Sequence, residues 1–293
     1  MDFSSLKIFK TVVDEGGVIP AARKLHRVPS NVTTRIKQLE ASLGVELFLR
    51  ENRRLVLSPA GETFLGYVEQ LLRLSEQARQ AVLGDVPAGV LKIGALESTA
   101  ACRLPRLLSR YHANYPEVRL ELITNTTDGL INAVLDRQVE AAFVVGRAEG
   151  TGLKALPAFD ETLAIIAPRS HPIIRRAVDV CTDTIISFPA GCAYRRHLQA
   201  WLAAGEVTPD KILELGSYHA MVACVAAGAG IALVPQAVLE TLRIIDGVAV
   251  YPMTGDRACL TTYLVSRPGQ VSPALRALQT DIGTKPKGES PRS

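Results

Sequence analysis

The chain has 293 residues, of which 47% are hydrophobic and 21% charged, and its formal net charge at pH 7 is +4. This length allows two or three domains with hydrophobic cores of their own, and the composition is that of an ordinary soluble protein. Residues 1–60 contain ten Lys or Arg and six Asp or Glu, whereas the two signs balance over the remainder. The excess positive charge therefore lies in the first 60 residues, where it suits a phosphate-binding surface and argues against a protein of the membrane surface.

The five cysteines argue against a disulfide framework or a metal site, because their number is odd and no two are spaced C-x-x-C. Reduced thiols of a cytosolic protein are the simplest interpretation, and no cofactor is predicted. The N-terminus carries Asp2 and no apolar signal core, so we expect a cytoplasmic protein.

The first predicted helix covers residues 3–13, where Phe3, Leu6, Phe9 and Val13 lie at helical spacing. We expect these four side chains to pack under the helix-turn-helix. Residues 15–57 then predict two short helices and a basic hairpin, which is the plan of a winged helix-turn-helix. The apolar faces of the two helices are Ala21, Ala22 and Leu25, followed by Val32, Ile36, Leu39 and Leu43. Pro20 and Pro29 lie in the predicted first turns, and Gly44 is a natural stop. The hairpin leucines expected to alternate inward are Leu47, Leu49, Leu55 and Leu57.

The face of the second helix opposite its apolar stripe is polar and basic. Such side chains reach base edges and phosphates when a helix lies in the major groove of DNA. The predicted DNA-binding residues are Pro29, Ser30, Asn31, Thr33, Thr34, Arg35 and Lys37 on this helix and Arg53 and Arg54 on the hairpin. A helical hairpin with a merely solvated face would carry similar charges, but the helix spacing, the small-residue face and the basic hairpin together favour binding to double-stranded DNA.

This segment resembles the N-terminal domain of the LysR-type transcriptional regulators. The matching residues are Phe9, Glu15, Gly16, Ala21, Ala22, Leu25, His26, Val32, Ile36, Leu39, Glu40, Leu43, Gly44, Leu47, Phe48 and Arg50, followed by the junction Leu57-Ser58-Pro59-Ala60-Gly61. The chain departs from the family at Gly17 and Ile19, where Ser or Thr is usual, and has Val28-Pro29-Ser30 where the family often has Ser-Gln-Pro. The recognition helix should therefore start differently, so the family's base contacts cannot be copied in detail.

Residues 59–84 predict a long helix, with Ser58 as N-cap and Pro59 in the first turn. Its apolar residues spread over one broad side and are Phe64, Leu65, Val68, Leu71, Leu72, Ala78 and Val82. A helix on the order of 35–40 Å long with a partly apolar face needs a partner. It could pack on its own chain, whereas the resemblance implies that it pairs with its copy in a homodimer or homotetramer.

A linker at residues 85–89 precedes alternating strands and helices, which predict an α/β domain with mostly parallel sheets. The predicted strands are 90–96, 118–124, 141–145, 163–167, 184–187, 211–215, 231–234 and 259–266. The predicted helices are 100–114, 128–138, 192–203, 220–227 and 272–283. The uncharged run 221–239 is long enough for a membrane span, but Gly228, Gly230 and Pro235 interrupt it. We interpret it as a buried helix, a glycine turn, a buried strand and the start of another helix.

The resemblance to LysR-type regulators extends over the whole chain, most visibly in residues 89–101 and 217–235. It implies a two-lobed effector domain like that of periplasmic binding proteins. The implied divisions are 1–58 for the winged helix-turn-helix, 59–84 for the linker and dimerisation helix, and 89–293 for the effector domain, with lobe I at 89–160 and 266–293 and lobe II at 161–265. Within the family, the stretches LESTAA, CAYRRH and SYHAMVACV are similar to a regulator of putrescine use.

In such folds, ligands bind at the carboxyl ends of strands, in the cleft between the lobes. The predicted effector-binding residues are Ser98, Thr99, Thr126 and Thr127 on one lobe and Tyr194, Arg195 and Tyr218 on the other. Plain helix capping is the alternative for Ser98 and Thr99, and a surface helix start is the alternative for Tyr194 and Arg195.

The chemistry of the effector is left open by the charges near these positions. Arg195 would suit a carboxylate, whereas Glu97 and Asp128 would suit an amine. The effector is therefore an amino acid, a diamine or a carboxylate, and the first two fit the mixture better than a simple dicarboxylate.

No catalytic residue is predicted, because the chain has no G-x-S-x-G sequence, no metal-ligand spacing and no phosphate-binding loop. The sequence instead predicts a cytoplasmic LysR-type regulator that binds promoter DNA and responds to a small molecule, with RNA polymerase as an open further partner. A solute-binding or transport protein is the alternative on the effector fold alone. The absent signal peptide and the basic N-terminal segment oppose it.

Overall fold

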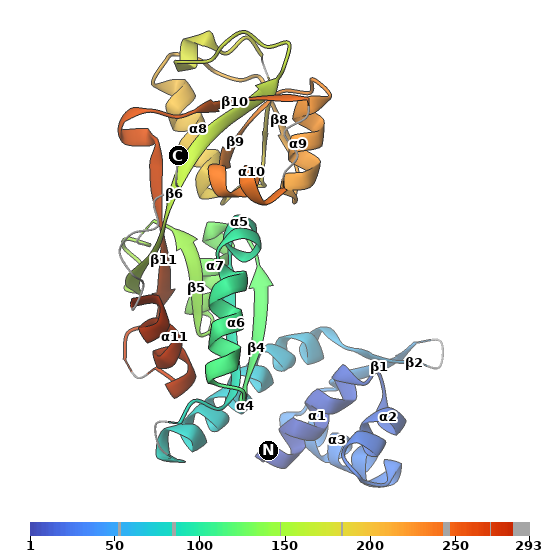
Figure 1. Ribbon diagram of the computed structural model, residues 1–293. Coiled ribbons are helices and arrows are strands. Elements are labelled where there is room, and N and C mark those ends of the chain that lie inside the picture. The colour runs from blue at the N-terminus through green and yellow to red at the C-terminus, as the bar shows by residue number, and fades with distance from the viewer. Residues whose placement is uncertain are drawn as a thin grey trace. The chain divides into compact units, whose positions relative to one another are not determined.

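The computed structural model describes residues 1–51, 54–83, 86–146, 148–182, 184–242, 247–269 and 271–283, which belong to two compact units, residues 1–84 and 85–293 (Figure 1). Each unit is described by itself. The elements of the first unit are α1 (Phe3–Asp14), α2 (Val18–Lys24), α3 (Pro29–Leu43), β1 (Phe48–Glu51), β2 (Arg54–Leu57) and α4 (Pro59–Leu83).

The core of the first unit joins α1, α2, α3 and the first half of α4. Its fully buried residues are Leu6, Ile8, Phe9, Val12, Ala21, Ala22, Val32, Ile36, Leu39, Leu47 and Val68. The predicted apolar faces of α2 and α3 are confirmed. Phe3 is exposed, contrary to prediction, because α1 begins there and Asp2 caps it by accepting a hydrogen bond from the backbone N–H of Ser5.

The hairpin β1–β2 is antiparallel, with Phe48 paired to Leu57 and Leu49 to Val56. Side chains alternate between the two faces of a strand, so Phe48, Leu55 and Leu57 pack on the core and Leu49 points away from it. The prediction that Leu49 faces inward is therefore wrong. Leu47 is buried just ahead of the strand, which shifts the alternation by one residue.

The second unit is an α/β structure with one continuous sheet. Its elements are β3 (Gly89–Ala95), α5 (Glu97–Cys102), α6 (Leu104–Asn114), β4 (Val118–Thr124), α7 (Thr127–Leu135), β5 (Ala141–Val145), β6 (Lys154–Pro168), a 3-10 turn (Ala177–Asp179), β7 (Thr184–Ser187), α8 (Ala193–Ala203), β8 (Lys211–Glu214), α9 (Tyr218–Ala226), β9 (Ile231–Pro235), α10 (Gln236–Leu242), β10 (Val248–Pro252), a second 3-10 turn (Gly255–Arg257), β11 (Cys259–Ser266) and α11 (Pro273–Gly283).

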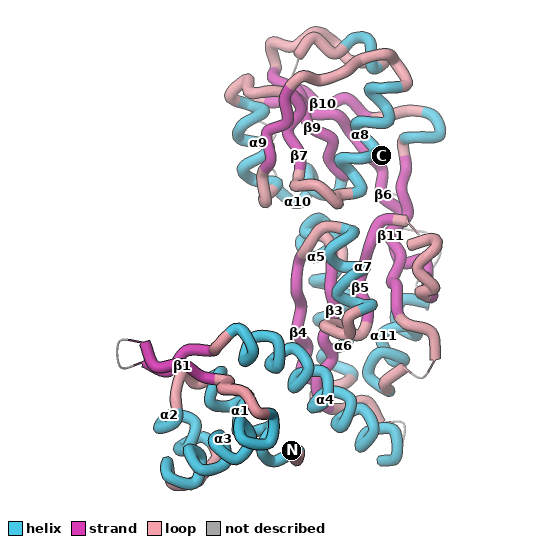
Figure 2. The backbone as a smooth tube through the Cα atoms, turned by 180° about the vertical axis from the view of Figure 1, so that it is seen from behind, coloured by secondary structure: helices cyan, strands magenta, loops and turns pink. Residues whose placement is uncertain are grey.

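The strand order is β4-β3-β5-β11-β6-β9-β7-β8, and β10 pairs with β6 off this path. Strands β6 and β11 run through both halves of the unit, as Figure 2 shows from behind. We call the half around β3, β4 and β5 the first lobe and the half around β7, β8, β9 and β10 the second lobe. The α/β class is confirmed, but the sheet is mixed rather than mostly parallel, because β11 and β6 pair antiparallel with their neighbours.

The largest differences in extent between prediction and structure concern β6 and the helix predicted over 100–114. Strand β6 covers residues 154–168, where only 163–167 was predicted, because polar residues such as Asp160 and Glu161 interrupt its apolar pattern. The helix predicted over 100–114 is two helices that meet at Arg103, since Pro105 in the first turn of α6 lacks the N–H of a continuous helix. Strand β10 was not predicted.

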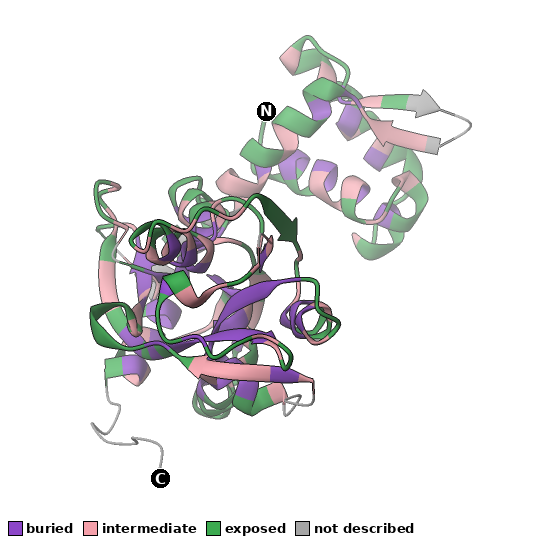
Figure 3. Ribbon diagram, turned by 90° about the horizontal axis from the view of Figure 1, so that it is seen from above, coloured by how far each residue is buried: buried purple, intermediate pink, exposed green. Residues whose placement is uncertain are grey.

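The uncharged run 221–239 folds as predicted. It supplies most of α9, the wholly buried strand β9 and the start of α10. Figure 3 shows that buried residues gather inside each unit. Within the described ranges, none of the helices combines the length and the apolar character that a membrane span needs.

Candidate nucleic-acid interface and ligand cavity

Helix α3 has one buried and one exposed face. Val32, Ile36 and Leu39 are buried in the core of the first unit. Of the predicted DNA-binding residues, Pro29, Ser30, Asn31, Thr34 and Lys37 are exposed, and Thr33 and Arg35 are partly buried. The backbone N–H groups at its start have no side-chain cap, because Val28 holds the N-cap position and Pro29 follows.

Some side chains on the exposed side of α3 already have partners. The Thr33 hydroxyl donates to the carbonyl oxygen of Pro29 at 3.0 Å, and Arg27 donates to the amide oxygen of Asn31 at 3.3 Å. The guanidinium of Arg35 lies 3.8 Å from the carboxylate of Asp2. Ser30, Thr34 and Lys37 are exposed and have no such partner among the described contacts, so they are the most freely available of these polar side chains.

The hairpin that follows α3 is fixed at its base by two polar side chains, those of Glu40 and Ser58. The Glu40 carboxylate accepts from the backbone N–H of Leu47 at 2.8 Å. The Ser58 hydroxyl donates to the carbonyl of Glu46 and accepts from the N–H of Gly61. A Cβ at Gly61 would lie 2.1 Å from the Leu47 oxygen, so only glycine fits there. Arg53 lies outside the described residues, and nothing is described of the Arg54 side chain.

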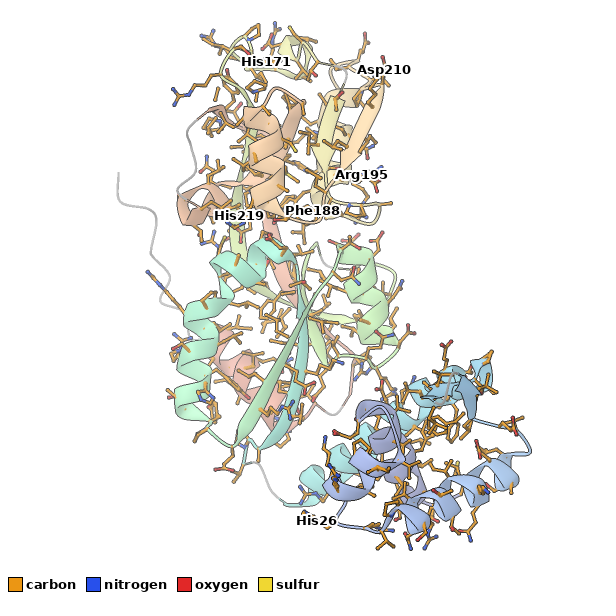
Figure 4. The ribbon with its side chains drawn as sticks, turned by 90° about the vertical axis from the view of Figure 1, so that its right-hand side faces the viewer. His26, His171, Phe188, Arg195, Asp210 and His219 are labelled. Atoms are coloured by element: carbon orange, nitrogen blue, oxygen red, sulfur yellow. The ribbon has the colours of Figure 1, made fainter. Side chains whose placement is uncertain are left out.

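The second unit contains a cavity of about 200 Å³ between its two lobes. The first lobe contributes the ends of β3 and β4 and the starts of the helices that follow them. The residues that line the cavity are Leu96, Glu97, Ser98, Thr124, Asn125 and Thr126 from the first lobe and Phe188, Pro189, Cys192, Tyr194, Gly216 and Tyr218 from the second. Figure 4 shows Phe188 and His219 at the end of the second lobe that faces the first.

Of the seven predicted effector residues, Ser98, Thr126, Tyr194 and Tyr218 line this cavity, whereas Thr99, Thr127 and Arg195 do not. Thr99 and Thr127 are buried, because each lies one residue further into its helix and turns toward the interior of its lobe. The Thr126 hydroxyl caps α7 by accepting a hydrogen bond from the backbone N–H of Gly129. Helix capping, which was the alternative for Ser98 and Thr99, is therefore found at Thr126, whereas α5 has no side-chain cap.

Arg195 is turned away from the cavity. Its guanidinium donates to the Glu214 carboxylate on β8 and, at 3.5 Å, to the carbonyl oxygen of Phe188. The neighbouring Arg196 reaches across to the first lobe, where its guanidinium lies 3.0 Å from a carboxylate oxygen of Asp128. Both arginines beside the cavity are thus neutralised by carboxylates of the protein itself.

The two lobes also meet through backbone groups at the rim of the cavity. The N–H of Asp128 donates to the carbonyl oxygen of Gly191 at 3.2 Å. Gly191 has a φ of +89°, and a Cβ there would lie 3.0 Å from the Thr126 hydroxyl. The contact between the loop before α8 and the start of α7 therefore requires glycine at position 191.

Three residues that line the cavity carry a buried side-chain oxygen with no hydrogen-bond partner among the described residues. These atoms are one carboxylate oxygen of Glu97, the hydroxyl of Ser98 and the phenol oxygen of Tyr194. A buried polar atom without a partner costs about 1–3 kcal/mol, so a bound ligand that pairs these atoms would recover that cost.

The protonation of these groups is set mainly by burial. Loss of water raises the pKa of the Glu97 carboxyl, and the nearby His219 lowers it in part. Burial also raises the pKa of Tyr194 and Tyr218. Both phenols are therefore neutral and able to donate at physiological pH.

Four of the twelve residues that line the cavity were predicted as effector-binding residues. Leu96, Thr124, Pro189, Cys192 and Gly216 have no sequence feature that points to a ligand. Asn125 and Phe188 follow strands in the same way as the predicted residues, and that position was the signal available for them. Among the described residues, no group of three or more His, Cys, Asp or Glu could hold a metal ion.

Comparison with known families gives two matches that together span nearly the whole chain. The model described as the bacterial regulatory helix-turn-helix protein, lysR family, matches residues 3–62, and that of the LysR substrate binding domain matches residues 84–282.

Two curated relatives match over nearly their full length. The chain is 35% identical over 295 residues to the uncharacterized HTH-type transcriptional regulator YusT of Bacillus subtilis, covering 100% of this chain and 99% of that protein. It is also 35% identical to the HTH-type transcriptional regulator GltR of Bacillus subtilis, with 96% of each chain covered.

Solved structures share the fold. The LysR family transcriptional regulator CbnR in complex with its target DNA matches with a TM-score of 0.69 at 24% identity, covering 97% of this chain and 99% of that one. The probable transcriptional regulator PA0477 of Pseudomonas aeruginosa matches with a TM-score of 0.71 at 20% identity, with 97% of each chain covered.

Proposed function

The chain belongs to the LysR family of transcriptional regulators, and on this premise we propose that α3 and the hairpin β1–β2 read promoter DNA while a small molecule in the inter-lobe cavity controls the outcome. The protein is a DNA-binding regulator with an effector domain, not an enzyme. The solute-binding alternative loses its basis, because the helix-turn-helix model matches residues 3–62.

The observation that carries the DNA-binding assignment is the division of α3 into a buried apolar face and an exposed face of short polar and basic side chains. Hydroxyl, amide and guanidinium groups on one exposed helix face match the donors and acceptors of base edges in the major groove. We assign this role to Pro29, Ser30, Asn31, Thr33, Thr34, Arg35 and Lys37, and phosphate or minor-groove contacts to Arg53 and Arg54. Thr33 is the weakest of these candidates, since its hydroxyl is already bonded within the helix.

Replacing Arg35 or Thr34 by alanine is expected to weaken specific DNA binding by about 1–3 kcal/mol, because each would remove a contact to a base edge. The bound genomic sites are first mapped, and a fluorescein-labelled site is then titrated by anisotropy against a shuffled duplex. Arg119→Ala removes the same charge from an exposed position of the second unit and serves as the matched control.

The control variant is expected to bind both duplexes like wild type. A loss that is equal on the specific and shuffled duplexes would assign Arg35 to a phosphate instead of a base. Wild-type affinity of both α3 variants for the specific site would refute the assignment of α3 as the reading helix.

We assign residues 1–58 to DNA binding, 59–84 to dimerisation and 89–293 to effector binding, with the lobes divided at 160/161 and 265/266. We propose an amino acid, a diamine or a carboxylate as the effector. We further propose that the protein acts in the cytoplasm, with RNA polymerase as a further candidate partner. The unpaired polar atoms around the cavity support an effector at this place.

A homodimer through α4 is supported by the apolar residues that this helix leaves exposed. Tyr67 and Leu74 are 61% and 53% exposed and lie seven residues apart, on one side of the helix. Val68 is not part of that surface, because it is fully buried in the core of its own unit. Of the apolar residues on the broad side predicted for this helix, Val68 therefore packs on its own chain, and we place the seam at Tyr67 and Leu74.

A further inference from the structure

We propose that the inter-lobe cavity binds a small aliphatic amine with no carboxylate of its own, and that Glu97 is the counter-ion of its ammonium group. This inference rests on the proposed role of the cavity as the effector site. It goes further by choosing one of the three ligand classes that the sequence leaves open.

The charges around the cavity favour a cation. Among the described residues that line it, Glu97 alone carries a formal charge. The two arginines close by are held elsewhere, Arg195 by Glu214 and Arg196 by Asp128. A carboxylate ligand would meet the Glu97 charge in a partly desolvated space with no lining arginine or lysine to offset it, which is strongly unfavourable.

The unpaired atoms also suit an ammonium group. An alkylammonium has three donors and no acceptor. The free carboxylate oxygen of Glu97, the Ser98 hydroxyl and the Tyr194 phenol can each accept one hydrogen bond, and all three belong to residues that line the cavity. Ser98 and Tyr194 are only 4% and 3% exposed, so water does not easily replace the ligand as their partner.

Aromatic rings form much of the remaining wall. The rings of Phe188 and Tyr218 are 4.9 Å apart and tilted by 58°, and Tyr194 lies on the same side of the cavity. Aromatic faces attract an ammonium group, and together with Leu96 and Pro189 they offer apolar contact to an aliphatic chain. The volume of about 200 Å³ is below the usual range for drug-sized ligands, which indicates a small molecule.

The test uses four-carbon probes that differ only in their end groups: butylamine, 1,4-diaminobutane, 4-aminobutanoate and succinate. Binding to the purified full-length protein is measured by titration calorimetry at about pH 7.5, where alkylamines are protonated. We expect at least one of the two amines to bind, 4-aminobutanoate to bind more weakly, and succinate not to bind. The two amines distinguish a monoamine from a diamine as the preferred form.

Glu97→Gln keeps the size of the side chain and removes its charge, so it is expected to weaken amine binding by about 10- to 100-fold. Glu97→Asp keeps the charge and is expected to retain the preference for amines over succinate at reduced affinity. Glu117→Gln makes the same charge change at an exposed turn outside the cavity and should bind like wild type.

The pKa of Glu97 supplies a check that the Gln variant is folded. Because burial raises this pKa, the ionised carboxylate destabilises the ligand-free protein once the pH exceeds the unfolded value of about 4.5. The charged or titratable groups that act on it are His219, Cys102 and Tyr218. As the pH rises from about 4 to 7, ligand-free wild type should therefore lose thermal stability relative to Glu97→Gln.

Three results would overturn the amine assignment: tighter binding of succinate than of both amines, no binding of either amine up to about 10 mM, or unchanged amine binding in Glu97→Gln. DNA binding by the ligand-free wild-type protein separates this failure from that of the proposed function. If wild type binds its mapped site but no amine, only the ligand class is wrong.

Discussion

Val68→Asp is expected to unfold the first unit, whereas Leu74→Asp on the same helix should leave it folded and dissociate the oligomer. Val68 is fully buried among the core residues of α1, α3 and α4, and Leu74 is 53% exposed. Burying a carboxyl group in place of an apolar side chain costs more than about 4 kcal/mol, a large part of the stability of a small domain. Far-UV circular dichroism melts and sedimentation velocity measure the two effects separately.

The two variants control for each other, because they introduce the same side chain on one helix and differ in burial. If Val68→Asp keeps the wild-type melt and merely sediments as a monomer, Val68 belongs to the interface after all. If Leu74→Asp sediments like wild type, the seam proposed at Tyr67 and Leu74 is not where the protomers meet.

Arg103→Met should destabilise the second unit by about 2–4 kcal/mol, because it leaves a buried carboxylate without its partner. Arg103 lies at the break between α5 and α6 and forms a bidentate pair with Glu161 on β6, with N–O distances of 2.9 and 2.8 Å. Glu161 is only 3% exposed, whereas the Arg103 side chain is 34% exposed. Because the Arg103 side chain is partly exposed to solvent, the expected loss of stability lies in the lower part of the range for a buried ion pair.

Urea denaturation of the second unit measures this loss. The control is Arg119→Met, which breaks an ion pair with Glu121 in which both side chains are exposed, and it should cost no more than about 1 kcal/mol. The double variant Arg103→Met with Glu161→Gln should recover part of the loss, since the amide is cheaper to bury than a charge. Equal losses for Arg103→Met and Arg119→Met would mean that the Arg103–Glu161 pair is effectively solvated.

The first unit was predictable from sequence because its signals are local. The stripe Val32, Ile36 and Leu39, the stop at Gly44 and the cap at Ser58 each depend on residues within one or two helical turns. The side chains of Phe3 and Leu49 were predicted to point inward but are exposed. Both errors fall at the start of an element, since Phe3 is the first residue of α1 and Leu49 the second of β1. A shift of one residue reverses the faces of a strand, so such errors are costly in a hairpin.

The second unit was less predictable because its main features depend on distant partners. The length of β6 follows from its pairing with β11, about a hundred residues later in the chain. The orientation of Arg195 depends on Glu214, which β8 brings alongside β7. No local pattern indicates whether an arginine turns toward a cavity or toward a neighbouring carboxylate.

The ion pair between Arg195 and Glu214 has an evolutionary consequence. The Arg195 side chain is 16% exposed. It lines a small pocket together with Phe188, Tyr194 and Tyr218, and these three residues also line the inter-lobe cavity. A single base change converts a glutamate codon to glutamine, and at position 214 it would release a guanidinium beside the ligand without altering the outline of the cavity. Duplicated genes that inherit this arrangement can thus diverge between cationic and anionic metabolites through a residue that never contacts either one.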